Sequence, residues 1–216
     1  MGRPSCHVNT NEYNSLMKNA DLLSRPKRTR DPDTKRAALH DAALQLFTEK
    51  GYENVSIAQV AKLAGIAVGT VYRFYDNKLA MLRAMLEEIE DRFVQRMKSE
   101  WSRGGDYDDR LDAVCEGLFI VAEENRSLLR LLTMTTDVVY VDDALPGDRI
   151  QSQIRAFYAE GMSEGAFVQG DVDMMAAMAH GLVEGAMMRA MRSGNSNQTE
   201  AVAQLTKVMK NAFLNR

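Results

Sequence analysis

The chain has 216 residues, of which 45% are hydrophobic and 26% charged, values typical of a soluble protein with a packed core. Its two cysteines are too few for a disulfide framework, and its most apolar stretch, residues 174–183, is far shorter than the roughly 20 residues that span a bilayer. The net charge of −3 does not indicate a nucleic-acid partner, but residues 25–82 carry ten Lys or Arg against six Asp or Glu, whereas residues 83–216 are acidic.

The first part of the chain is expected to be a disordered arm. Residues 1–30 are polar and show no apolar period, as in segments that cannot bury a core. The arm ends in basic residues that include Arg28 and Arg30. Such an arm either enters the minor groove of DNA, where narrow A·T-rich sequence attracts arginine, or remains a solvated tail that adds only non-specific affinity.

A first helix is predicted after the arm. Asp31 followed by Pro32 is typical of an N-cap and a first helical position, and Gly51 is typical of a helix end. The apolar residues between them recur at helical spacing and predict one buried stripe: Leu39, Ala42, Ala43, Leu46 and Phe47. We expect His40 on the exposed face of this helix.

Residues 56–78 have the pattern of two short helices joined at a glycine. Ser56 followed by Gln59 predicts a capping box, in which each side chain bonds the backbone N–H of the other residue. Gly65 lies where the turn between the helices needs a positive φ, which glycine adopts without steric cost. A helix-turn-helix of this kind places its second helix in the major groove of DNA, and the alternative is a plain helical hairpin. The expected outer face of the second helix comprises Val68, Gly69, Thr70, Tyr72 and Arg73.

The rest of the chain is predicted to be helical almost to its end. Glycine, proline and asparagine separate the apolar-periodic segments. The expected helices are 77–102, 108–124, 126–134, 148–164, 172–192 and 198–214. The fold class is therefore all-α, with a three-helix N-terminal helix-turn-helix domain over residues 31–78 and a six-helix domain over residues 79–216.

The motif resembles the DNA-binding signature of the TetR (tetracycline-repressor-like) family. The match covers residues 33–82 and rests on Phe47, Gly51-Tyr52, Ile57, Val60-Ala61, Ala64-Gly65-Ile66, Gly69-Thr70-Val71-Tyr72 and Asn77-Lys78. The resemblance implies a homodimeric transcriptional regulator, expected to be a repressor, whose headpieces bind a palindromic double-stranded DNA operator. It also implies that residues 79–216 form a ligand-binding and dimerisation domain, in which a small-molecule effector releases the DNA.

The resemblance assigns phosphate contacts to several motif residues. Thr70 and Tyr72 match positions that usually contact operator phosphates, and Lys78 matches a lysine that typically reaches one. Hydroxyl, phenol and ammonium groups near helix N-termini suit phosphate, which positions a protein without reading sequence. Ser56, at the start of the motif, is also expected on the DNA-binding surface.

Other motif positions are expected to lie near the bases. Val68 and Arg73 occupy positions that often approach base edges, although a phosphate contact or a solvated side chain is equally compatible with Arg73. Gly69 allows the backbone to approach the sugar-phosphate chain closely. The chain departs from the family at Ala67, where a Ser or Thr cap is usual, and at Tyr75, where Phe is usual. The Tyr75 hydroxyl therefore needs a partner or access to water.

The last two helices carry the expected dimer interface. Ala177, Gly181 and Gly185 recur four residues apart, and small residues at this spacing favour close approach of helices. In the family the last two helices pair with those of a second copy. The full set expected at the interface is Ala177, Gly181, Gly185, Met188, Leu205 and Met209. The alternative is close packing inside one subunit.

A ligand pocket is expected among the middle helices. Fourteen methionines provide adaptable apolar linings and favour an apolar or amphipathic effector. The candidate lining residues are Trp101, Phe119, Met134, Phe157, Met162 and Met178. At helical spacing such residues are also those of an ordinary core.

The sequence contains no pattern for catalysis or metal binding. Three histidines and two cysteines assemble no nucleophile, base and orienting partner, so no enzyme, cofactor or metal site is expected. Cys115 is expected to be a small buried residue, and the acidic run from Asp106 to Asp112 is expected to stabilise a helix N-terminus. The protein is expected to be cytoplasmic and not bound to a membrane. The alternative function is a helical module that binds a small molecule or a partner without specific DNA binding.

Overall fold

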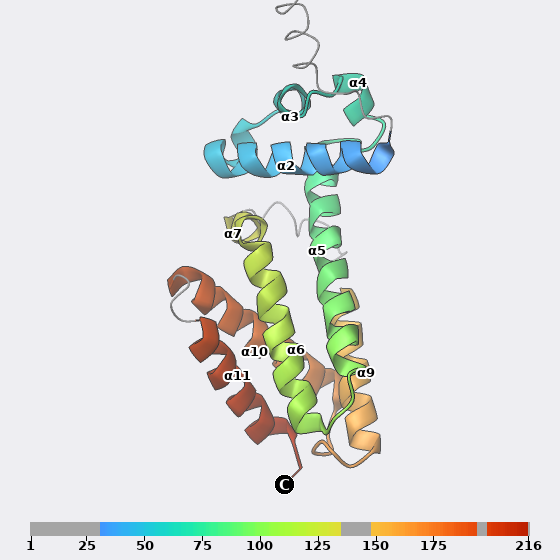
Figure 1. The fold of residues 1–216 in the computed structure, drawn as a ribbon, viewed down its shortest axis with the longest axis vertical. Coiled ribbons are helices and arrows are strands. Elements are labelled where there is room, and N and C mark those ends of the chain that lie inside the picture. The colour runs from blue at the N-terminus through green and yellow to red at the C-terminus, as the bar shows by residue number, and fades with distance from the viewer. Residues whose placement is uncertain (1–30, 135–147, 194–197, 216) are drawn as a thin grey trace, which may run out of the picture. The chain divides into compact units, whose positions relative to one another are not determined.

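A computed structural model describes residues 31–134, 148–193 and 198–215 (Figure 1). Its contacts divide the chain into two units, Met1–Ala38 and Leu39–Arg216. The elements are α2 (Pro32–Lys50), η1 (Tyr52–Asn54), α3 (Ile57–Leu63), α4 (Val68–Val71), α5 (Lys78–Trp101), α6 (Tyr107–Glu124), α7 (Arg126–Met134), α9 (Asp148–Ser163), α10 (Val172–Ser193) and α11 (Gln198–Phe213).

The described part of the first unit is the start of α2, which Asp31 caps. One Asp31 carboxylate oxygen accepts hydrogen bonds from the Thr34 backbone N–H at 3.1 Å and from the Thr34 hydroxyl at 2.7 Å. These bonds favour the charged carboxylate and lower the pKa of Asp31. The predicted N-cap is confirmed. The expected arm, residues 1–30, lies outside the described residues.

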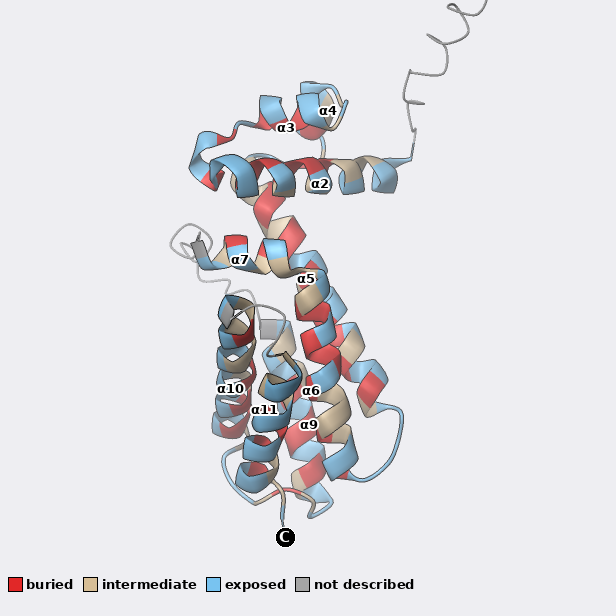
Figure 2. Ribbon diagram, turned by 60° about the vertical axis from the view of Figure 1, so that its left-hand side comes forward, coloured by how far each residue is buried: buried red, intermediate tan, exposed pale blue. Residues whose placement is uncertain are grey.

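In the second unit, five long helices form a closed bundle. Helices α5, α6, α11, α10 and α9 each pack against the next, and α9 packs back against α5 (Figure 1). Helix α7 follows α6 after a break at Asn125. Buried residues follow the sides of α5 and α6 that face the other helices (Figure 2). The core is therefore a continuous set of apolar side chains inside the bundle.

The acidic run at the start of α6 has the structural role that the sequence predicts. Asp106 is the N-cap, and its side chain accepts the Asp109 backbone N–H at 2.9 Å. Asp108 and Asp112 lie on the same side of the helix and form ion pairs with Lys210 of α11, the latter at 2.7 Å. The run thus stabilises the first turn of α6 and fixes α11 against it.

Aromatic residues fill the end of the bundle where α9 ends. Phe167 is fully buried and packs against Tyr107, Phe157 and Tyr158, with ring centroids about 5 Å apart. Gly161 of α9 makes this packing possible, because a Cβ there would lie 2.1 Å from the Phe167 ring. The loop after α9 is held to the end of the chain by an isolated antiparallel bridge between Phe167 and Leu214.

The expected all-α fold is confirmed. The six helices predicted after residue 77 agree with the structure to within one residue at each end. No helix within the described ranges combines the length and the apolar character needed to cross a membrane. The domain boundary expected between residues 78 and 79 stays a prediction.

Candidate nucleic-acid interface and ligand cavity

Helix α3 begins with the predicted capping box. The Ser56 hydroxyl oxygen accepts the Gln59 backbone N–H at 3.3 Å, and the Gln59 side-chain oxygen accepts the Ser56 N–H at 2.7 Å. Ile57, Val60 and Ala61 are buried behind the cap. The box therefore fixes the start of α3 while leaving Ser56 itself exposed.

A tight turn joins α3 to α4. Gly65 has a φ of 67°, as the sequence predicts, and the Ile66 N–H donates to the Ala61 carbonyl at 2.9 Å. Helix α4 is a single turn, and Val71 anchors it with no exposed surface. Ala67, the N-cap, contributes no side-chain hydrogen bond, in agreement with the loss of a Ser or Thr cap.

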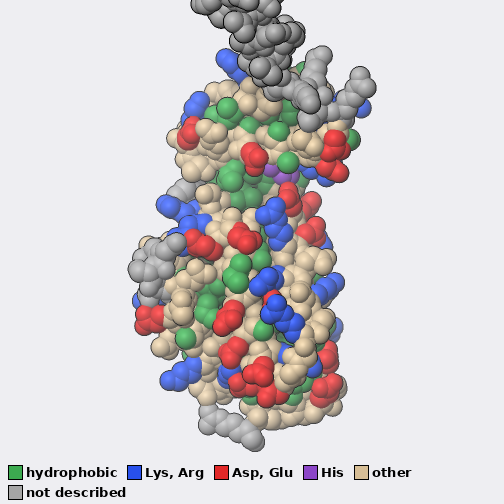
Figure 3. Space-filling model, in the orientation of Figure 1, with side chains coloured by type: hydrophobic (Ala, Val, Ile, Leu, Met, Phe, Trp, Pro, Cys, Tyr) green, Lys and Arg blue, Asp and Glu red, His purple; other side chains and the backbone are tan. Residues whose placement is uncertain are grey.

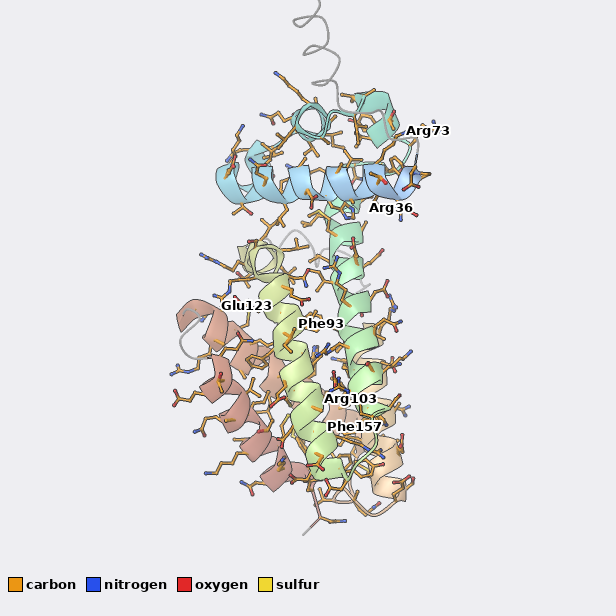
Figure 4. All side chains as sticks on the ribbon, in the orientation of Figure 1. Arg36, Arg73, Phe93, Arg103, Glu123 and Phe157 are labelled. Carbon is orange, nitrogen blue, oxygen red and sulfur yellow. The ribbon has the colours of Figure 1, made fainter. Side chains whose placement is uncertain are left out.

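The exposed side of α4 carries most of the residues expected to meet DNA. Val68 is 40% exposed and Tyr72 is 55% exposed. Gly69 and Arg73 are also exposed, and Thr70 is half-buried; Figure 4 shows Arg73 just beyond α4. The short helix therefore presents a set of side chains that the core of the unit does not use. Their contacts with DNA stay predictions.

Lys78 has a structural role that the sequence does not reveal. Its ammonium group donates to the backbone carbonyls of Tyr52, at 2.7 Å, and Glu53, at 3.3 Å. It also lies 4.2 Å from the centroid of the Tyr52 ring, a cation–π contact. Lys78 therefore ties the start of α5 to η1. Its expected phosphate contact stays a prediction, and Arg28 and Arg30 lie outside the described residues.

The predicted exposure of His40 is wrong. Only 11% of its side chain is exposed. Its Nε2 lies 2.7 Å from the Tyr75 hydroxyl, and its Nδ1 lies 3.1 Å from a Glu88 carboxylate oxygen. The cause is the buried Tyr75 hydroxyl, which needs a hydrogen-bond partner and finds it in His40. The pattern of α2 alone cannot show this, because the partners lie 35 and 48 residues away in sequence.

The contacts of His40 continue along α5 to the end of α6. Glu88 accepts a hydrogen bond from Arg92 at 2.7 Å, and Arg92 donates to the Asn125 side-chain oxygen at 3.1 Å. We refer to His40, Tyr75, Glu88, Arg92 and Asn125 as the polar chain. Burial acts to raise the pKa of Glu88, but hydrogen bonds from Arg92 and His40 outweigh it and lower this pKa. The polar chain thus joins α2, α5 and the C-terminus of α6.

A cavity of about 310 Å³ lies among α5, α6, α7, α9 and α10. Its apolar lining residues are Leu86, Ile89, Phe93, Leu118, Leu129, Leu132, Ile150, Ile154, Val183, Met187, Met188 and Met191. Its polar lining residues are Glu90, Thr133, His180 and Glu184. Phe93 extends from α5 into the interior of the bundle (Figure 4). The size lies at the lower end of the roughly 300–1,000 Å³ of small-molecule sites.

Five of the six residues expected to form the pocket do not line this cavity. Trp101 and Phe157 pack edge to face and line a separate space of about 30 Å³, and Phe119 borders a smaller one. Met162 is half-buried, and Met178 is 47% exposed. The Met134 side chain lies outside the described part. The apolar stripe of α5 through Leu86, Ile89 and Phe93 is visible in the sequence, but the stripe alone does not distinguish a cavity wall from an ordinary core.

Cys115 is a core residue, as expected. It is 1% exposed, and its Sγ lies 3.7 Å from the Met209 Sδ. Burial raises the pKa of its thiol to about 12. The thiol is therefore protonated at neutral pH and is a poor nucleophile. Across the described ranges no His, Cys, Asp and Glu side chains cluster closely enough to hold a metal ion.

Helices α10 and α11 present an exposed apolar face. Ala177, Gly181 and Gly185 are exposed, and nothing lies within 4 Å of a Cβ built on either glycine. The large apolar side chains of this face are Met174, Met178, Leu182 and Val208, with exposures between 37% and 59%. These three small residues of α10 therefore do not serve close helix packing inside the described subunit. We refer to these seven residues as the α10–α11 face.

Three residues expected on this face point inward instead. Met188 lines the 310 Å³ cavity, and Leu205 and Met209 are 5% and 4% exposed. The reason is that α11 packs against α6, so the apolar stripe of α11 fills the core of its own bundle. Val208 is the apolar residue that α11 contributes to the exposed face.

Comparison with known proteins identifies the family. Residues 39–85 match the sequence profile described as bacterial regulatory proteins, tetR family. A TetR family transcription regulator from Marinobacter aquaeolei VT8 has a similar structure, with a TM-score of 0.67 at 20% identity over 85% of this chain and 97% of that one. Residues 39–85 therefore form a tetR-family segment, and the chain has the fold of TetR family regulators.

Other members of the TetR fold are similar at low identity. The nucleoid occlusion factor SlmA of Photobacterium profundum is 28% identical over 162 residues, which are 72% of this chain and 82% of that protein. FadR from Bacillus subtilis, solved in complex with stearoyl-CoA, has a TM-score of 0.64 at 20% identity over 79% of this chain and 97% of that one. The comparisons thus show a helix-turn-helix segment of the tetR family within a fold that these regulators share.

The polar chain predicts a pH-dependent contribution of Glu88 to stability. Because the folded-state pKa is lowered, the contribution is present above the unfolded-state pKa of about 4.3 and is lost as the pH falls through the folded-state value. Glu88→Gln should therefore lower the free energy of unfolding at pH 7 by about 0.5–1 kcal/mol, the range for partly exposed pairs. At pH 3 the difference in stability between the variant and the wild type should be smaller than at pH 7. Urea titrations at both pH values measure the difference.

Glu87→Gln is the matched control, since Glu87 is the exposed neighbour of Glu88 on α5. It should leave stability at pH 7 unchanged. A Glu88→Gln defect that persists undiminished at pH 3 would contradict the assigned role of the Glu88 charge.

Proposed function

We propose that this protein is a homodimeric transcriptional repressor that binds a palindromic operator and releases it when a small molecule occupies the 310 Å³ cavity. The observation that carries the proposal is that one helix, α5, serves both sites. Its start is held by Lys78 to η1, which immediately precedes the helix-turn-helix, and its middle lines the cavity through Leu86, Ile89 and Phe93. The two sites are therefore physically connected within one unit.

The exposed side of α4 supports binding in the major groove. Val68 and Arg73 are available to base edges, and the hydroxyls of Thr70 and Tyr72 are available to phosphates. These side chains are not needed to hold α4 in place, because Val71 does so. In this mechanism Arg73 and Val68 contribute specificity, and Thr70 and Tyr72 position the headpiece.

The α10–α11 face supports a homodimer. Exposed large apolar side chains on a soluble protein mark a surface that another protein covers. Gly181 and Gly185 leave room for the helix of a second copy to approach closely. A twofold dimer also matches a palindromic operator, whose half-sites lie roughly 34–36 Å apart. A second copy of this chain is therefore the proposed occupant of the face.

The cavity supports control by a small molecule. FadR from Bacillus subtilis, which has a similar fold, was solved with stearoyl-CoA bound. For this chain, we propose that the effector occupies the cavity and shifts the population towards headpiece positions that no longer fit two half-sites. The polar chain connects His40 of α2 with the neighbourhood of the cavity. Its last member, Asn125, ends α6 immediately before α7, and Leu129 of α7 lines the cavity.

Selection from a random-sequence duplex pool tests the DNA-binding part. The purified protein should enrich an inverted repeat with half-sites one helical turn apart. A Tyr72→Ala, Arg73→Ala double variant should bind the selected duplex at least about tenfold more weakly, because each base or phosphate contact contributes about 1–3 kcal/mol. Both side chains are exposed, so their removal leaves the core intact.

Lys207→Ala is the control for the loss of one positive charge, since Lys207 is an exposed residue of α11. It should bind the selected duplex as the wild type does. Absence of any enriched sequence at low salt would contradict the proposal and favour a helical binding module without specific DNA binding.

Substitution of Gly181 tests the dimer. Gly181→Leu should shift the protein from dimer to monomer in size-exclusion chromatography with light scattering, because the leucine occupies space that the second copy needs. Nothing within its own described subunit obstructs the new side chain. Ala156→Leu, at an exposed position of α9, adds the same side chain away from the face and should remain dimeric. An undiminished Gly181→Leu dimer would exclude the α10–α11 face as the interface.

A further inference from the structure

The charged residues among the described lining of the proposed effector cavity are acidic. Two of its described lining residues, Glu90 and Glu184, are acidic, and no Lys or Arg is among them. Among the described lining residues an anionic group would find like charge and no Lys or Arg, whereas a cationic group would find the opposite charge of Glu90 and Glu184. The lining therefore discriminates between ligands by the sign of their charge.

Glu90 is held in place with part of its carboxylate unused. It is half-buried, and its Oε1 accepts the backbone N–H of Arg149 at 3.0 Å near the start of α9. That bond fixes the side chain and leaves the second oxygen without a described hydrogen-bond donor. The Arg149 guanidinium forms its ion pair with Asp91 and not with Glu90.

Glu184 provides the second charge from α10. No described residue forms an ion pair or hydrogen bond with its carboxylate. His180 lies one turn before it, and the His180 Nδ1 is 3.4 Å from the Gln151 side-chain nitrogen. Because an amide N–H₂ group donates, Nδ1 acts as the acceptor in this contact.

The apolar part of the lining also suits a cation with an apolar body. Phe93 is 8% exposed, and its ring can bind a cation through its negative face. Met187, Met188 and Met191 of α10 supply polarizable, adaptable surface for a flexible chain. An ammonium group near the glutamates and a hydrocarbon body against the methionines would satisfy both kinds of surface.

We propose that the effector is an amphipathic cation: a hydrocarbon body that carries an amine or quaternary ammonium group, selected by Glu90 and Glu184. This inference rests on the proposed role of the cavity as the effector site. It does not depend on the identity of the operator.

Three decyl compounds that differ only in their head group test the inference. Decyltrimethylammonium, 1-decanol and decanoate are titrated below their micelle concentrations into the purified protein by calorimetry. Decyltrimethylammonium should bind about tenfold more tightly than decanol, and decanoate should bind at least about tenfold more weakly than decanol. The preference should shrink as salt is added, because exposed charges are screened.

The Glu90→Gln, Glu184→Gln double variant removes both charges while keeping an acceptor oxygen for the Arg149 N–H. In this variant the three compounds should bind within a few-fold of one another, with decanol unaffected. Glu87→Gln, Glu124→Gln is the matched control, because it removes two exposed glutamates outside the lining. It should keep the full preference for the cation.

The outcomes separate two kinds of failure. If no decyl compound binds, the cavity is not an effector site, and both this inference and that part of the proposed function are overturned. If decanoate binds as tightly as the cation, or the double variant keeps the preference, the cavity remains a ligand site and the charge selection is wrong.

Discussion

The rest of the second unit depends on helix α5, because this single helix contacts η1 and α2 and also lines the cavity. At its start, Lys78 holds the carbonyls of η1, and further along Glu88 holds His40 of α2. Between and beyond these points, Leu86, Ile89 and Phe93 line the cavity. Because an α-helix is stiff over its length of about 36 Å, α5 is the proposed route by which a change at the cavity wall reaches the residues that hold α2 and η1.

The polar chain depends on Tyr75, which stands where Phe is usual in the family. Tyrosine at position 75 introduces a buried hydroxyl, and burial without a partner would be costly. His40 provides the partner, and Glu88 in turn orients His40. Acidic and basic side chains are interspersed over the outer surface of α5 and α6 (Figure 3). The exposed ion pair between Glu88 and Arg92, two members of the polar chain, belongs to this surface. A polar connection thus accompanies the apolar contacts of α5.

The sequence predicts local features well and long-range ones poorly. The capping box, the positive φ at Gly65 and the helix limits depend on neighbouring residues, and all are confirmed. The low exposure of His40 and Leu205 depends on helices distant in sequence. The predicted exposure of His40 is wrong, and the predicted interface role of Leu205 stays a prediction. An apolar side chain at helical spacing is equally consistent with a core, a cavity wall or an interface. Only the packing of the other helices decides among the three, which explains why the cavity lining differs from the residues expected.

The most direct test of the account is whether occupancy of the cavity changes operator affinity. Fluorescence anisotropy of a labelled selected operator measures that affinity with and without a saturating concentration of decyltrimethylammonium. If the two sites are coupled, the ligand should weaken operator binding about 5- to 150-fold, the usual range of allosteric coupling, and the operator should weaken ligand binding by the same factor. An operator affinity that is unchanged while the cavity is occupied would contradict the coupling of the two sites through α5.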